Sequence, residues 1–108
     1  MNEKILEIIN HYGIRKQLKY FQSEIFELNE AIIDFENYED LVDIEIDTKE
    51  HLKNHITEEI ADVMVMLKQM QLYYNISDAD VKEVMKFKVD RQIERINEEV
   101  SKNDKWCY

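Results

Sequence analysis

The chain lacks proline and contains a single glycine, Gly13, so the two strongest breakers of regular helices are almost absent. It has one cysteine, Cys107, and an intrachain disulfide therefore cannot form, which fits a reducing compartment. No apolar run approaches the roughly 18 residues that a membrane span needs. The first residues also lack the basic and long apolar regions of a signal peptide, so we expect a cytoplasmic protein with no membrane partner.

Basic residues are scarce as well. Because 24 acids face 14 bases, the net charge is −10, and such a surface repels phosphate backbones. We therefore expect no nucleic-acid partner, although a small phosphate ligand can bind if a divalent cation carries the positive charge. The apolar share of 44% is too high for a disordered chain, and 108 residues suit one domain over residues 1–108.

The residues that are abundant, Glu, Lys, Leu, Ile and Met, favour helices. Apolar positions recurring every three or four residues predict an all-α, four-helix fold over residues 3–11, 14–36, 49–74 and about 78–101. Four helices in a chain this short leave a thin core. We therefore expect the bundle to be completed by oligomerisation, with at least a dimer.

Helix ends are predicted from capping residues. The N-terminal caps are expected at Asn2, Thr48 and Ser77, and Gly13 is expected to end the first helix. Residues 37–47 are mostly polar and lose the helical stripe, so they predict a loop with a short extended piece around 41–46. That loop is the place where a mobile flap is expected.

The two central helices each carry an apolar stripe and a second row beside it. The stripes comprise Leu18, Phe21, Ile25, Leu28, Ile32 and Phe35 on one helix, and Ile56, Ile60, Val63, Leu67, Met70 and Tyr74 on the other. The second rows comprise Gln17, Tyr20, Glu24, Glu27, Ala31 and Asp34, and Glu59, Asp62 and Met66. We expect the acids of these rows to lie at the margin of the core.

Asp62 has an unusual setting, because every other residue from Ile60 to Leu67 is apolar. A helix that is apolar all round is predicted to be buried, and a buried carboxylate must be paired or must bind a metal. The alternative is a salt bridge to Lys or Arg of another helix. His55 lies seven residues earlier, and we interpret it as a surface residue.

Two acid pairs, Glu24/Glu27 and Glu59/Asp62, are each spaced by one helical turn. If their helices pack antiparallel, the four carboxylates can converge on a hard cation such as Mg²⁺, which prefers oxygen ligands. The same spacing occurs at Glu27/Glu30 and Glu36/Glu39, which we interpret as solvated acids.

A basic face is predicted on the last helix, where Lys88, Arg91 and Arg95 are spaced by three and four residues. Arginine can bind phosphate oxygens through two donors at once, so this face is a candidate phosphate-binding surface. The alternative is a solvated face whose bases pair with neighbouring acids.

The segments Ser23-Glu24-Ile25-Phe26-Glu27-Leu28 and Glu58-Glu59-Ile60-Ala61-Asp62-Val63 resemble the E-E-x-x-E … E-x-x-D signature of the all-α, MazG-type nucleotide pyrophosphohydrolases. The basic face resembles that family's phosphate-binding segment, and the likeness spans roughly residues 14–97. Ser23 stands where the family has its first glutamate. In addition, 31 residues separate Glu27 from Glu59, which is a long interval for the family.

The resemblance implies a homodimer or homotetramer. It implies Mg²⁺ ligands at Glu24, Glu27, Glu59 and Asp62, with Mn²⁺ as a possible substitute. It implies that a nucleoside triphosphate substrate is cleaved between the α and β phosphates, giving a monophosphate and pyrophosphate. Glu58 is expected to orient water or a ligand. The expected substrate-binding residues are Gln17, Lys88, Arg91 and Arg95. Two alternatives are a dUTPase or phosphoribosyl-ATP pyrophosphatase relative, and a non-catalytic helical dimerisation module.

Overall fold

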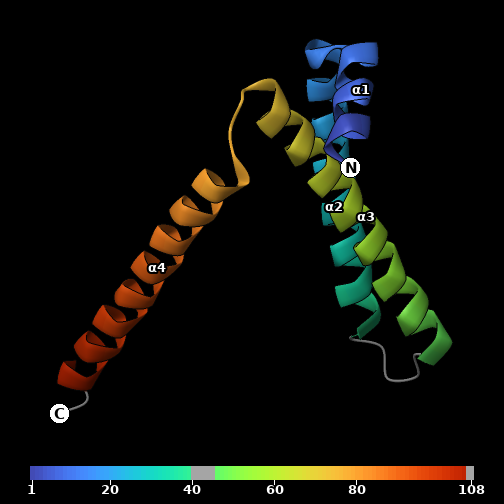
Figure 1. Cartoon of the computed structure of the whole chain (residues 1–108). Coiled ribbons are helices and arrows are strands. Elements are labelled where there is room, and N and C mark those ends of the chain that lie inside the picture. Colours follow the sequence, from blue (N-terminus) through green and yellow to red (C-terminus); the bar gives the residue numbers. More distant parts are fainter. Residues whose placement is uncertain (40–45, 107–108) are drawn as a thin grey trace. The chain divides into compact units, whose positions relative to one another are not determined.

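The computed structural model describes residues 1–39 and 46–106, and within them it contains four α-helices and no strand. The helices are α1 (Asn2–Tyr12), α2 (Ile14–Glu39), α3 (Ile46–Tyr73) and α4 (Asp78–Trp106) (Figure 1). The predicted all-α, four-helix fold is therefore confirmed. None of the described helices is long and apolar enough to cross a membrane.

The chain divides into two compact units, Met1–Asn75 and Ile76–Tyr108. The first unit contains α1, α2 and α3, and the second contains α4. The apolar side of α4, represented by Met85, Val89 and Ile93, is exposed. The assignment of residues 1–108 to a single domain remains a prediction.

Two of the predicted helix ends are confirmed. Gly13 ends α1 with a φ of 86°, which a residue without a side chain adopts readily, and its N–H donates to the Ile9 carbonyl at 2.8 Å. Ser77 caps α4, because its Oγ accepts a hydrogen bond from the Asp80 N–H at 3.0 Å. After α3, Asn75 has a φ of 57°, a left-handed conformation that asparagine tolerates better than most residues, and the chain turns there.

Other boundaries differ from the prediction. Asn2 is the first residue of α1 rather than its cap, and Thr48 lies inside α3, which begins two residues earlier. Residues 37–39 continue α2, and residues 46–47 already belong to α3. With no proline or glycine to stop them, both helices run further into the polar segment than its composition indicated. Residues 40–45, which carry the rest of the predicted loop and flap, lie outside the described residues.

Helices α2 and α3 run antiparallel, and α3 packs against both α1 and α2 (Figure 1). Gln17 contacts Gln69 while Glu27 approaches Glu59, so residue numbers fall along α3 as they rise along α2. Among the described residues of this unit, the fully buried apolar side chains are few: Ile5, Ile9, Ala31 and Met66. The core is therefore as thin as the chain length predicted.

The packed faces of α2 and α3 are rotated from the predicted stripes. Leu18, Ile25, Ile60 and Leu67 are each more than a third exposed. Phe21, Leu28 and Phe35 of the predicted stripe do pack. Among the described side chains, the less exposed positions of α2 are Ile14, Gln17, Phe21, Glu24, Leu28, Ala31 and Phe35. A helix packs along one line of residues, and here that line runs between the two predicted rows. Glu24 and Glu59 therefore lie in the interface rather than at its margin.

Candidate metal centre

Three carboxylates converge between α2 and α3. Glu24, Glu27 and Glu59 each offer one carboxylate oxygen, and these three oxygens all lie within 4.8 Å of one another. The three-residue spacing places Glu24 and Glu27 on successive turns of α2, and the antiparallel packing brings Glu59 opposite them. The predicted convergence of acids from the two central helices is thus observed for these three residues.

Two oxygens of this cluster are buried without a hydrogen-bond partner. They are Oε2 of Glu24 and Oε2 of Glu59, and Glu59 as a whole is only 9% exposed. A buried acceptor that bonds to nothing is costly, and an ionised one more so. A cation is the ligand that would satisfy both oxygens and offset the mutual repulsion of the carboxylates.

The pKa of Glu24 is raised above its ordinary value of 4.5. The largest cause is the loss of hydration on burial, followed by the negative charges of Glu27, Asp62 and Glu59. Each of these causes penalises the ionised form in the absence of a counter-ion. A bound cation would therefore stabilise the ionised form of Glu24.

His55 contributes a contact that the sequence interpretation missed. Its Nε2 lies 3.2 Å from Oε1 of Glu59, one helical turn away on α3, while the imidazole itself is about half exposed. This close approach involves Oε1 of Glu59 and leaves Oε2 of the same carboxylate without a hydrogen-bond partner. The four-residue spacing was the available signal, because residues i and i+4 are neighbours on a helix.

Asp62 departs from the prediction, because it is exposed. Met64 and Val65 are exposed as well, so the prediction of an all-round buried helix is wrong. Within Met1–Asn75, α1 and α2 cover only one side of α3. Asp62 is not among the three acids that converge, yet its charge helps to raise the pKa of Glu24, so it lies close to the cluster. Its role as a fourth ligand remains a prediction.

Gln17 and Gln69 form a buried amide pair about two turns along α2 from the acids. Gln17 donates from Nε2 to Oε1 of Gln69 at 2.8 Å, and Nε2 of Gln69 contacts Sδ of Met66 at 3.6 Å. Gln69 is 1% exposed, and Gln17 keeps an unpartnered buried Oε1. The substrate-binding role of Gln17 remains a prediction. Gln69 was not predicted from the sequence, because the row of Glu59 and Asp62 was extended only as far as Met66.

Glu58 precedes Glu59 on α3 and is not among the three acids that converge. Glu58 is exposed and lines a pocket of about 200 Å³ with His51, Asn54 and His55.

The predicted phosphate-binding residues of α4 are all exposed: Lys88, Arg91 and Arg95. They belong to the second unit, so their contribution to the site remains a prediction.

Comparison of the chain with protein families, with curated proteins and with solved structures found no match.

Proposed function

We propose that this chain is a Mg²⁺-dependent nucleoside triphosphate pyrophosphohydrolase of the MazG type, which releases pyrophosphate and a nucleoside monophosphate. The observation that carries the proposal is the convergence of Glu24, Glu27 and Glu59 within 4.8 Å, with buried oxygens that have no partner. These are the positions at which the sequence resembles the metal-binding acids of that family. A structural salt bridge is a weaker explanation, since Oε2 of Glu24 and Oε2 of Glu59 are buried without a hydrogen-bond partner.

The donor set fits a hard divalent cation. All three groups are carboxylates, and Mg²⁺ prefers oxygen ligands while keeping several waters of its own. Glu24, Glu27 and Glu59 would hold the ion, with Asp62 as the proposed fourth ligand. When bound, the ion supplies charge neutralisation for the triphosphate and lowers the pKa of the attacking water.

The remaining proposed roles belong to side chains of this chain. His55 holds one oxygen of Glu59 and thereby fixes the orientation of that carboxylate. Glu58 is proposed to orient water, and Gln17 to contact the substrate. Lys88, Arg91 and Arg95 are proposed to stabilise the charge of the departing pyrophosphate.

Self-association is part of the same proposal. The outer side of α3 exposes Ile60, Met64 and Leu67, and α2 exposes Phe26 and Ile33 on its surface. Contiguous apolar side chains on a small helical unit favour association, so we propose a homodimer or homotetramer. These residues equally support the second candidate, a non-catalytic module that dimerises through the two central helices.

The test is pyrophosphate release across a panel of nucleoside and deoxynucleoside triphosphates with Mg²⁺. The wild-type chain should hydrolyse at least one of them, and Asp62→Asn, which is nearly isosteric, should abolish turnover. Glu30→Gln is the matched control, because it removes the same charge from an exposed position of α2 and should retain activity.

A melting experiment separates the two candidates. Millimolar Mg²⁺ should raise the melting temperature of the wild-type chain, because a ligand that binds only the folded state stabilises it. If neither Mg²⁺ nor Mg²⁺ with a non-hydrolysable triphosphate changes the melting temperature, the enzyme proposal fails and the module is favoured.

A further inference from the structure

The start of α2 is a basic region in an otherwise acidic chain. Residues 8–23 form its longest stretch without Asp or Glu, and they contain Arg15, Lys16 and Lys19. The first turn of α2 has no acidic residue to balance the positive end of the helix dipole, and it carries two of these bases instead. Dipole and side chains therefore create a local positive potential beside an acidic protein surface.

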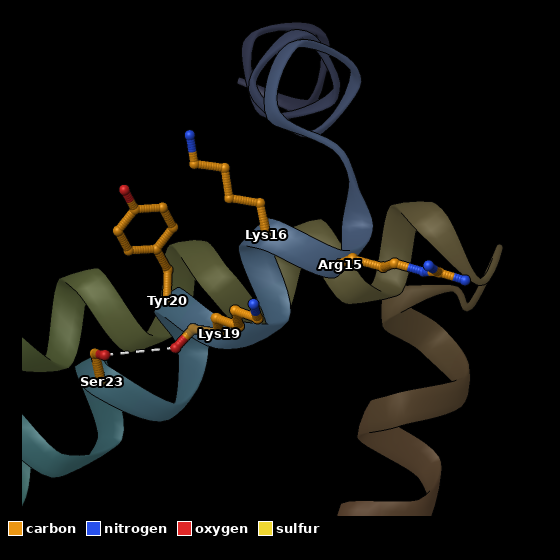
Figure 2. Close-up of a pocket in the computed structure, with 5 residues that line it drawn as sticks. All are labelled: Arg15, Lys16, Lys19, Tyr20 and Ser23. Carbon is orange, nitrogen blue, oxygen red and sulfur yellow. Dashed lines mark hydrogen bonds between the residues drawn. The ribbon is translucent and has the colours of Figure 1, made fainter.

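These bases line a groove of about 580 Å³ together with Tyr20 and Ser23 (Figure 2). Figure 2 shows Lys16 and Tyr20 extending in the same direction from neighbouring turns, whereas Arg15 extends in another direction. The Nζ of Lys16 lies 5.3 Å from the ring centroid of Tyr12, a contact that helps to place this ammonium group. In the part of the chain that the structure describes, none of the three bases forms an ion pair.

The groove lies directly beside the acidic cluster. Lys16, Tyr20, Ser23 and Glu27 are spaced by four, three and four residues, so they form one row on the same face of α2. Ser23, which lines the groove, precedes Glu27 of the cluster by four residues, one turn on the same face and about 6 Å along the helix axis. This separation is comparable to the length of a triphosphate chain. A phosphate group bound in the groove can therefore belong to the same ligand as a phosphate at the metal centre.

Ser23 keeps this row free of negative charge before Glu24. The Ser23 hydroxyl donates to the Lys19 carbonyl at 3.4 Å, so this uncharged side chain lies against its own helix. The MazG-type signature has glutamate at this position, and a glutamate would repel an anion in the groove. Serine in place of the family's glutamate at position 23 therefore favours the binding of an anion in the groove.

We propose that this groove binds the terminal phosphates of the nucleotide, and the pyrophosphate product, through the ammonium groups of Lys16 and Lys19 and the hydroxyl of Tyr20. The inference rests on the proposed function, which supplies the substrate class. It assigns an anion-binding role to residues outside the acidic motif and outside α4.

The test is calorimetric titration of the full chain with inorganic pyrophosphate and Mg²⁺. The double variant Lys16→Gln/Lys19→Gln should weaken binding by about tenfold or more, since each lysine donates charge-assisted hydrogen bonds. The control Lys4→Gln/Lys53→Gln removes the same charge from exposed positions elsewhere in Met1–Asn75 and should change the dissociation constant by less than about threefold. Ser23→Glu should weaken binding as well.

Equal weakening by both double variants would overturn the proposal, because the effect would then be one of net charge alone. Unchanged binding in Lys16→Gln/Lys19→Gln would also overturn it. The Mg²⁺-induced rise in melting temperature, measured on the same samples, should persist in this variant and shows that the acids and the fold are intact. If the wild-type chain shows neither the rise in melting temperature nor turnover, the proposed function fails. The groove proposal is still supported in that case if the chain binds pyrophosphate without Mg²⁺ and only Lys16→Gln/Lys19→Gln loses this binding. If turnover occurs and the variant leaves KM unchanged, the groove proposal fails and the proposed function stands.

Discussion

Two neighbouring rows of residues on α3 differ in the polarity of the side chains that they bury and expose. The row that faces α1 and α2 includes Glu59, Met66 and Gln69, all buried. The neighbouring row exposes Ile60, Met64 and Leu67. The inner row thus buries two polar side chains beside Met66, while the neighbouring row leaves three apolar side chains exposed. Buried polar groups without full pairing reduce stability, and Oε2 of Glu59 in the inner row is such a group.

Among the substitutions that test this difference between the two rows, Glu59→Gln should have the largest effect. The amide keeps the shape of the side chain but cannot bind a cation as a carboxylate does, so turnover and the Mg²⁺-induced rise in melting temperature should both be lost. Without metal, the variant should melt at a higher temperature than the wild-type chain, because a carboxylate is removed from beside Glu24 and Glu27. Thermal melting with and without Mg²⁺, together with pyrophosphate release, measures this.

Ile60→Gln is the matched control, because it places the same side chain one position along α3 in the exposed row. It should retain the response to Mg²⁺. If both variants lose that response, the distinction between the two rows has no bearing on metal binding.

Gln69→Leu should have the second largest effect, which is a loss of stability. It removes the acceptor of the Gln17 Nε2 hydrogen bond and leaves a buried donor unpaired, which costs about 1–3 kcal/mol of unfolding free energy. Urea denaturation measures the loss. The double variant Gln17→Leu/Gln69→Leu should recover part of it, since no polar group is then left without its partner. Equal stability of the wild-type chain and Gln69→Leu would mean that the amide pair is not formed in solution.

The raised pKa of Glu24 predicts a smaller, pH-dependent effect in metal-free buffer. The folded chain retains this proton at pH values where the unfolded chain has lost it, so the folded state binds more protons in that window. The stabilisation is complete below about pH 4.5 and is lost as the pH rises through the higher pKa of the folded state. Melting temperatures of the wild-type chain and Glu24→Gln, recorded in a chelator from about pH 4 to 7, should therefore diverge as the pH rises, with the variant becoming the more stable.

Adding Mg²⁺ should reverse this trend for the wild-type chain only, because metal binding requires the ionised carboxylates. A difference between the two proteins that does not vary with pH would contradict the assigned pKa direction.

Met64→Gln should have the smallest effect on the chain itself. The side chain is 58% exposed, and surface substitutions away from special features usually change the unfolding free energy by about 0.5 kcal/mol or less. If the exposed row mediates self-association, the same variant should weaken it, which sedimentation over a range of protein concentrations detects. Unaltered association would place the contact between copies on another surface.

The helices and the candidate acids could be predicted from the sequence with useful accuracy. Spacing placed Glu24 and Glu27 one turn apart, and the pairing with Glu59 followed from antiparallel packing of neighbouring helices. The burial of Asp62 was predicted wrongly, because apolar neighbours indicate burial only if other elements surround the helix. The contact of His55 with Glu59 went unnoticed because i,i+4 pairs are frequent and few of them matter.

The sequence alone determined the all-α character, through the near absence of helix breakers, and it determined which acids lie one turn apart on each helix. Only the tertiary structure decided which line of residues on α2 and α3 faces inward, and therefore that Glu59 and Gln69 are buried while Ile60 is exposed. The reason is that periodicity is a property of one helix and specifies spacing along it. The rotation of a helix about its axis depends on packing against all of its neighbours at once.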